Sequence, residues 1–162
     1  MAQGQGGAIP PGPGAAGPGA PDAGGARPGG FELLEHTADV GIRAWAGSLE
    51  EAFEHATEGL AEVLGALAPR PGEATPVEVT APDPGGLLVD WLNEVLWLLE
   101  VSRAGLAGVR VERVSDGVAR GSVEIAPGGP DPDGTFVKAV TYHRLRVEPE
   151  PGGWLLEVYL DV

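Results

Sequence analysis

The segment from Leu87 to about Arg103 constrains the fold most, because its apolar residues cover nearly the whole surface of a helix. These apolar residues are Leu87, Leu88, Trp91, Leu92, Val95, Leu96, Leu98 and Leu99. The narrow polar side is formed by Asp90, Asn93, Glu94 and Glu100. A helix with so little polar surface is typical of the buried centre of a domain. We therefore expect Trp91 and Trp97 to lie in the core or under a sheet.

A second helix is predicted earlier in the chain, where Ser48-Leu49-Glu50-Glu51 forms a capping box with Ser48 as the N-cap. Apolar residues then recur at helical spacing: Leu49, Ala52, Phe53, Ala56, Leu60, Val63 and Leu64. The opposite side carries four glutamates: Glu50, Glu54, Glu58 and Glu62. Gly65 is a natural end, so this helix is amphipathic and packs one face on the core.

The other ordered segments have the composition and alternation of strands. They are Phe31–Leu34, Val40–Ala46, Pro76–Ala81, Leu106–Val114, Val118–Ile125, Val137–Val147 and Trp154–Leu160. Ser115-Asp116-Gly117 indicates a hairpin, while Pro82–Gly86 reads as a turn or loop before the apolar helix. The order β-β-α-β-α-β-β-β-β predicts an α+β domain with two helices packed on a mostly antiparallel sheet.

The first thirty residues differ from the rest. Residues 1–30 contain 11 Gly and 6 Pro with only two charged residues, so we expect a disordered tail and not a signal peptide. Residues 31–162 then form one domain of ordinary size. No apolar run is long enough to span a bilayer, so no membrane partner is expected. The chain has no cysteine, which excludes disulfides and thiolate zinc sites and suits a cytoplasmic protein.

The charge balance is strongly acidic, with 24 Asp and Glu against 10 Lys and Arg and a net charge of −14. This balance opposes stand-alone binding to nucleic acid, whose affinity comes largely from cations that meet phosphates. It favours a basic protein partner or a metal ion, or it serves solubility alone.

Polar groups gather where two strands begin and end. His36, Thr37 and Asp39 form a polar break before one strand, and Asp161 with the terminal carboxylate of Val162 follows another. If the two strands are neighbours, up to three anionic groups converge at one end of the sheet. A hard cation such as Ca²⁺ or Mg²⁺ prefers carboxylate, carbonyl and water ligands of this kind. The alternative is that Asp39 only caps a turn and the chain end is solvated.

Other chemistries have little support. The three histidines, His36, His55 and His143, have no spacing typical of a zinc site. No nucleophile-elbow sequence and no phosphate-binding glycine loop at a helix start is present, although counting residues does not exclude a catalytic triad.

Four segments, in the same order, resemble the archease family. They are FELLEHTADVGIRAWAGSLEEAFEHATEGLAEVL, LLVDWLNEVLWLLE, VKAVTYHRLRVE and the terminal GWLLEVYLDV. The resemblance covers most of residues 31–162 and leaves out the glycine- and proline-rich extension. The loop Gly128–Gly134 differs from the family only in its length.

This resemblance implies a non-enzymatic protein cofactor that activates an RtcB-type RNA-splicing ligase. Archeases promote guanylylation of that ligase and its multiple turnover in tRNA splicing or RNA repair, so RNA would be met only through the ligase. The metal site of the family, described with calcium, corresponds to Asp39, Asp161 and a terminal oxygen of Val162.

Four further residues are candidates for a rim that touches the ligase or its nucleotide: His36, Lys138, Tyr142 and His143. Ordinary strand packing is the alternative role of these side chains.

Two other functions stay open. A chaperone-like binding module would hold unfolded clients independently of Asp39 and Asp161. A metal-dependent hydrolase at the same sheet end would need a general base, for which His36 is the only nearby candidate. The lack of a convincing nucleophile, base and oxyanion set favours the cofactor role.

Overall fold

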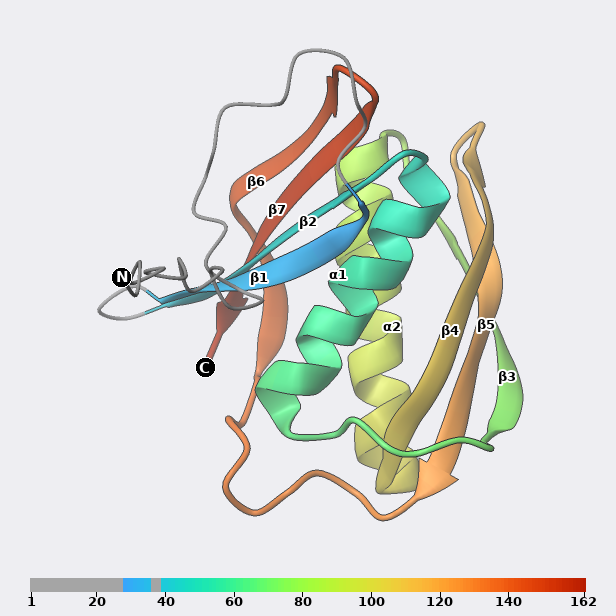
Figure 1. Cartoon of the computed structure of the whole chain (residues 1–162), viewed down its shortest axis with the longest axis vertical. Coiled ribbons are helices and arrows are strands. Elements are labelled where there is room, and N and C mark those ends of the chain that lie inside the picture. Colours follow the sequence, from blue (N-terminus) through green and yellow to red (C-terminus); the bar gives the residue numbers. More distant parts are fainter. Residues whose placement is uncertain (1–27, 36–38) are drawn as a thin grey trace, which may run out of the picture.

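The computed structural model describes residues 28–35 and 39–162 (Figure 1). The strands are β1 (Gly30–Glu35), β2 (Val40–Ala46), β3 (Glu73–Thr80), β4 (Ala104–Ser115), β5 (Val118–Pro127), β6 (Ala139–Glu150) and β7 (Gly153–Asp161). The helices are α1 (Leu49–Leu64) and α2 (Pro84–Ser102). The predicted order of helices and strands is confirmed.

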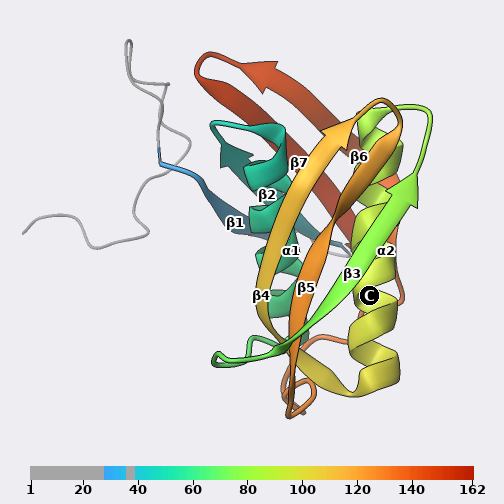
Figure 2. The same ribbon diagram turned by 90° about the vertical axis from the view of Figure 1, so that its right-hand side faces the viewer.

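The strands form two sheets rather than one. One sheet has four strands in the order β1-β2-β7-β6 and the other has three in the order β3-β5-β4, with all paired strands antiparallel. Figures 1 and 2 show both helices between the two sheets. This layering follows from α2, because a helix that is apolar around most of its circumference needs cover on both sides. The predicted α+β class is confirmed.

The core is centred on α2, where Trp91 is fully buried. The Trp91 indole donates a hydrogen bond of 3.0 Å to the Thr57 hydroxyl, and Thr57 donates one of 2.7 Å to the Phe53 carbonyl. Each polar atom that this tryptophan carries into the core therefore has a partner. The prediction was right for Trp91 and wrong for Trp97, which is 54% exposed.

The second helix begins three residues earlier than predicted, at Pro84. The Asp83 side chain accepts a hydrogen bond of 2.7 Å from the Gly86 amide, and Pro84 occupies the first turn. An acidic N-cap followed by proline is typical of a helix start. The two glycines that follow, Gly85 and Gly86, favour a loop, and the sequence therefore predicts a turn or loop here. The first helix begins and ends as predicted, since Ser48 accepts from the Glu51 amide and Gly65 adopts the left-handed conformation.

Helix side chains form hydrogen bonds with the backbone of two sheet edges. Glu54 accepts a hydrogen bond of 2.9 Å from the Val111 amide in β4, and Glu50 accepts one of 3.0 Å from Val114. On the other sheet, the Asn93 amide makes two hydrogen bonds with the backbone of Val140 in β6. The glutamates of α1 are therefore not all a solvated face. Two of them protect the free edge of β4 from pairing with another strand.

The late hairpins follow turn chemistry. Asp116 and Gly117 both have positive φ, and Ser115 pairs directly with Val118, which confirms the predicted hairpin as a two-residue turn. The tail predicted for residues 1–30 lies outside the described residues, apart from its last three. Of these, Gly30 already begins β1. In the described part of the chain, no helix is long and apolar enough to cross a membrane.

His55 and Glu58 on α1 predict a small pH dependence of stability. The two side chains lie 3.3 Å apart, and the hydrogen bond with Glu58 raises the pKa of His55 above its ordinary 6.5. When the pKa of a histidine is higher in the folded state, its protonation stabilises the fold. This stabilisation is complete below the ordinary pKa and is lost as the pH rises through the pKa of the folded state. Between about pH 6 and pH 8 we expect the free energy of unfolding to fall by about 0.3 kcal/mol from this pair. Urea unfolding of the wild type and His55→Gln measures it, and equal pH slopes in both would contradict it.

Candidate functional site

The register between β2 and β7 sets two aspartates opposite each other. Val40 pairs with Leu160, so Asp39 and Asp161 occupy the next opposing positions of the two neighbouring strands. Side chains alternate along a strand, and Leu160 is buried toward the helices, so both aspartates belong to the outer face of the sheet. Opposing residues of antiparallel strands have Cα atoms about 4.5–5.5 Å apart. The two strands are therefore neighbours, as the sequence argument required.

The carboxylates at this sheet end are available as oxygen donors. Asp39 is half-buried and Asp161 is exposed, and neither forms a side-chain hydrogen bond or ion pair within residues 28–35 and 39–162. Val162 is 38% exposed. Across these described residues no group of three or more His, Cys, Asp or Glu could hold a metal. A cation here would rely on two side chains, an oxygen of Val162 and water, a donor set that suits a hard ion.

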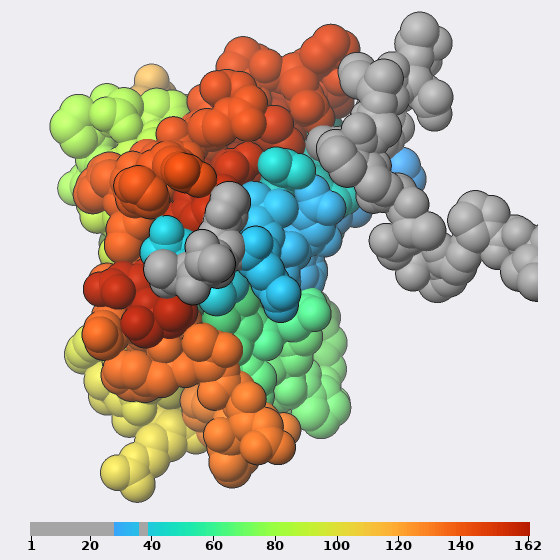
Figure 3. Space-filling view, turned by 90° about the vertical axis from the view of Figure 1, so that its left-hand side faces the viewer, coloured from blue at the N-terminus to red at the C-terminus, as the bar shows by residue number. Residues whose placement is uncertain are grey.

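The chain end and the start of β2 reach the surface together. Figure 3 shows the dark red residues at the end of β7 on the surface beside the cyan residues at the start of β2. Lys138, which directly precedes β6, reaches the same strand end, because its amide donates a hydrogen bond of 2.8 Å to the Asp161 carbonyl. Lys138 is exposed. The hydrogen bond joins the Lys138 backbone to the end of β7.

A large bulge interrupts β6 close to this end. Thr141 pairs with Tyr159, but the next paired residue is Arg146, so the four residues Tyr142–Leu145 lie outside the regular register. Arg144 within the bulge has a φ of 53°, a left-handed conformation that costs energy for a residue with a side chain. The sequence predicted an uninterrupted strand here. No glycine or asparagine marks the bulge, so the sequence carries no turn signal for it.

The bulge folds two of its side chains onto Tyr159. The His143 ring meets the Tyr159 ring edge to face at 6.2 Å, and the Arg144 guanidinium lies 5.9 Å from the centre of the same ring. The Tyr142 side chain does not lie on this ring. Its hydroxyl is near Gly86 at the start of α2, where a Cβ atom added to Gly86 would be 3.9 Å from it. The structure therefore sets His143 and Arg144 on the outer face beside the aspartates and separates Tyr142 from them.

A buried ionic cluster supports this face. The Glu157 carboxylate, in a residue only 7% exposed, accepts hydrogen bonds from Arg43 at 3.2 Å, Arg146 at 3.4 Å and the Tyr159 hydroxyl at 3.0 Å. Burial and the hydrogen bond with Glu157 raise the pKa of Tyr159. The tyrosine therefore stays neutral and donates a hydrogen bond to Glu157, which fixes the ring that His143 and Arg144 contact.

The structure thus brings together most of the predicted site residues. Asp39, Asp161, Val162 and the backbone of Lys138 share one sheet end, and His143 contacts Tyr159, which lies two positions before Asp161 on the outer face. His36 lies outside the described residues. Arg144 is the residue that sequence reasoning missed, because only the bulge turns it onto the face that carries the aspartates.

Comparison with known proteins identifies relatives along the whole domain. Residues 31–162 match the model of the Archease protein family (MTH1598/TM1083). The chain is 36% identical over 139 residues to a protein archease of Methanosarcina acetivorans, which covers 82% of this chain and 95% of the relative. It is 35% identical over 142 residues to a protein archease of Methanopyrus kandleri, with 82% and 99% covered.

Two solved structures have a similar fold. Protein 1598 of Methanobacterium thermoautotrophicum superimposes with a TM-score of 0.65 at 33% identity and covers 82% of this chain and 99% of that one. A Thermotoga maritima protein described as an archease and possible chaperone superimposes with a TM-score of 0.56 at 27% identity, with 81% and 96% covered.

Proposed function

This chain belongs to the archease family, and we propose that it is a non-enzymatic, metal-binding protein cofactor of an RtcB-type RNA ligase in the cytoplasm. It promotes guanylylation of the ligase and its multiple turnover in tRNA splicing or RNA repair. The observation that supports the proposal is the strand register that sets Asp39 opposite Asp161, beside the chain end.

In this proposal, Asp39, Asp161 and the terminal carboxylate of Val162 hold one divalent cation, Ca²⁺ in the first instance. Like charges this close disfavour one another unless a cation joins them. The available donors are oxygens, which Ca²⁺ accepts in flexible numbers and completes with water. When bound, the cation supplies positive charge that attracts phosphate oxygens.

The neighbouring cationic side chains form the rim that meets the ligase or its nucleotide. Lys138 is exposed and its backbone amide bonds to Asp161, and Arg144 with His143 lies on the Tyr159 ring of the outer face. Guanidinium and ammonium groups are ordinary partners of phosphate. The rest of the molecule is strongly acidic, with a net charge of −14, so RNA is contacted only through the ligase.

Multiple-turnover ligation by the cognate RtcB-type ligase, with the ligase limiting, tests the proposal. We expect the wild-type chain to accelerate turnover and Asp39→Asn and Asp161→Asn each to reduce that acceleration about tenfold or more, since each removes a charged ligand. Asp133→Asn is the matched control, because Asp133 is exposed in a loop and its side chain has no partner in the described residues. Full activation by both site variants would contradict the proposal.

Calcium titration separates the metal from the ligase. We expect the wild type to bind Ca²⁺ with measurable heat and both site variants to bind about tenfold more weakly or worse, while Asp133→Asn binds normally. Equal binding by all variants would show that these carboxylates do not hold the ion, whatever the ligation assay gives.

The chaperone-like function is the second candidate, because the similar Thermotoga maritima protein is described as a possible chaperone. It predicts suppression of aggregation of unrelated unfolded proteins, at equal strength for the wild type and Asp39→Asn. The cofactor function predicts that Asp39→Asn activates ligation less than the wild type does, and that neither protein suppresses aggregation in general.

A further inference from the structure

The edge of β3 lacks the hydrogen bonds that helix side chains make to the edges of β4 and β6. Glu50 and Glu54 bond to the edge of β4, and Asn93 bonds to the edge of β6. The edge strand β3 lies beside α2, yet within the described residues no α2 side chain hydrogen-bonds to its backbone. This edge is therefore open to another strand.

The open part of β3 is short and its position follows from Pro76. Proline has no amide hydrogen, so in this edge strand its nitrogen points away from β5. Backbone direction alternates, so the amide and carbonyl groups of Glu78 and Thr80 also point away from β5. Glu78 and Thr80 thus offer backbone hydrogen-bonding groups that β5 does not use, enough for one short added strand.

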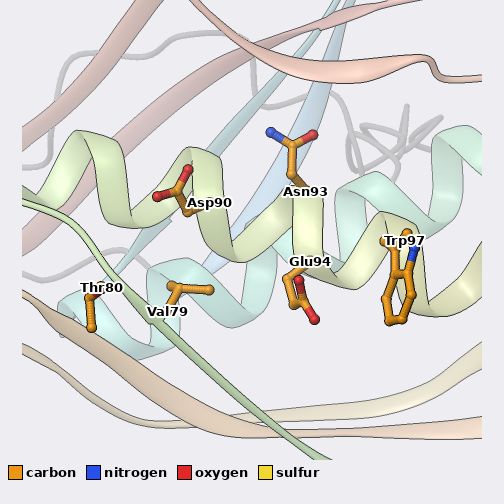
Figure 4. A pocket seen from close by; sticks show the side chains of 6 residues that line it. All are labelled: Val79, Thr80, Asp90, Asn93, Glu94 and Trp97. Carbon is orange, nitrogen blue, oxygen red and sulfur yellow. The ribbon is translucent and has the colours of Figure 1, made fainter.

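A hollow lies next to these groups, between β3 and α2. It has a volume of about 500 Å³ and is lined by Val79, Thr80, Asp90, Asn93, Glu94 and Trp97. Figure 4 shows Glu94 and Trp97 directed toward the β3 side of the helix, whereas Asn93 points the other way. The polar side of α2 that remains after core packing therefore faces a groove beside an open strand edge.

The lining of the hollow is acidic and partly apolar. Asp90 and Glu94 are half-buried, one helical turn apart, and no Lys or Arg among the described residues forms an ion pair with either. Trp97, on the following turn, is 54% exposed although it sits on the most apolar helix of the chain. Half-buried carboxylates beside an exposed indole are complementary to a guanidinium, which bonds to carboxylate and stacks on aromatic faces.

We propose that this groove docks an extended, arginine-bearing segment of a partner protein. The segment adds to β3 at Glu78 and Thr80 through backbone hydrogen bonds, and its arginine lies among Asp90, Glu94 and the Trp97 ring. A second copy of this chain fits less well, because two surfaces of the same strongly acidic protein repel each other. The groove is separated from Asp161 by β6, so this site is distinct from the sheet end that carries the aspartates.

NMR titration of the full ¹⁵N-labelled chain tests this docking site with a defined probe. The probe is the capped pentapeptide Val-Thr-Arg-Val-Thr, and the control peptide has citrulline, of the same shape but uncharged, in place of arginine. We expect saturable shifts at the amides of Glu78 and Thr80 and at the Trp97 indole N–H. The citrulline peptide should bind about tenfold more weakly.

Variants complete the test. Trp97→Ala and the double change Asp90→Asn with Glu94→Gln should each weaken binding of the arginine peptide about tenfold. Glu100→Gln, on the same helix outside the hollow, and Asp39→Asn, at the sheet end, should leave it unchanged. Equal binding of both peptides, no saturable shift, or shifts that depend on protein concentration without peptide would each overturn the proposal. Asp39→Asn alters the proposed metal site and not the groove beside β3. A negative result in the peptide titration would therefore not contradict the proposed role with the ligase.

Discussion

Replacing Trp91 by alanine should lower the free energy of unfolding by about 4 kcal/mol, the largest stability effect we expect in this chain. Trp91 is fully buried at the centre of α2, and its indole donates to Thr57. The substitution leaves a cavity between two sheets that are held apart by the helices. It also leaves the Thr57 hydroxyl without its donor, although that hydroxyl keeps its own bond to Phe53.

Urea unfolding followed by circular dichroism measures the change. Trp97→Ala is the matched control, since it removes the same side chain from the same helix at a position 54% exposed. We expect this control to lower stability by about 1–2 kcal/mol, at most half of the Trp91 effect, because more than half of its surface stays in water in both states. Equal losses for both tryptophans would contradict the placement of α2 between the sheets.

Glu157→Ala should have the second largest effect, a loss of about 2–3 kcal/mol. The change removes the acceptor shared by Arg43, Arg146 and the Tyr159 hydroxyl on the outer face of the sheet. Arg43 and Arg146 keep some contact with water, since 25% and 44% of their side chains are exposed, which limits the cost below that of a fully buried pair.

The control for this cluster is Glu148→Ala. Glu148 also bonds to Arg146, at 2.9 Å, but half of its side chain is exposed. We expect a clearly smaller loss than at Glu157, because exposed ion pairs add little to stability. Thermal unfolding of both variants at neutral pH decides the matter: a loss at Glu157 no greater than at Glu148 would show that burial of the cluster adds nothing.

Local chemistry was enough to predict the elements. Ser48 and Gly65 bound α1 because capping bonds involve residues close in sequence, and Asp116-Gly117 makes its hairpin for the same reason. The start of α2 was missed because Gly85 and Gly86 disfavour a helix, whereas in the structure the Gly86 amide donates an N-cap hydrogen bond to the Asp83 side chain and stabilises the helix start. The exposure of Trp97 was missed because apolar periodicity does not say where a neighbouring sheet ends.

The site could be predicted only in part. Asp39 and Asp161 were chosen because each adjoins a strand end, and the register of β2 with β7 sets them opposite. The bulge that turns Arg144 onto Tyr159 has no local signal, since it results from the pairing of β6 with a distant strand. Whether the aspartates hold an ion stays a prediction.

The amino-acid sequence by itself determined the helices, the strands, their order and the acidic charge, because these depend on residues near one another in the chain. Only the tertiary structure decided that two sheets enclose the helices, which edges Glu54 and Asn93 protect, and that β3 stays open beside Asp90 and Trp97. The physical reason is that strand pairing and burial join residues far apart in the chain. Their free energy belongs to the assembled pair and to neither segment alone.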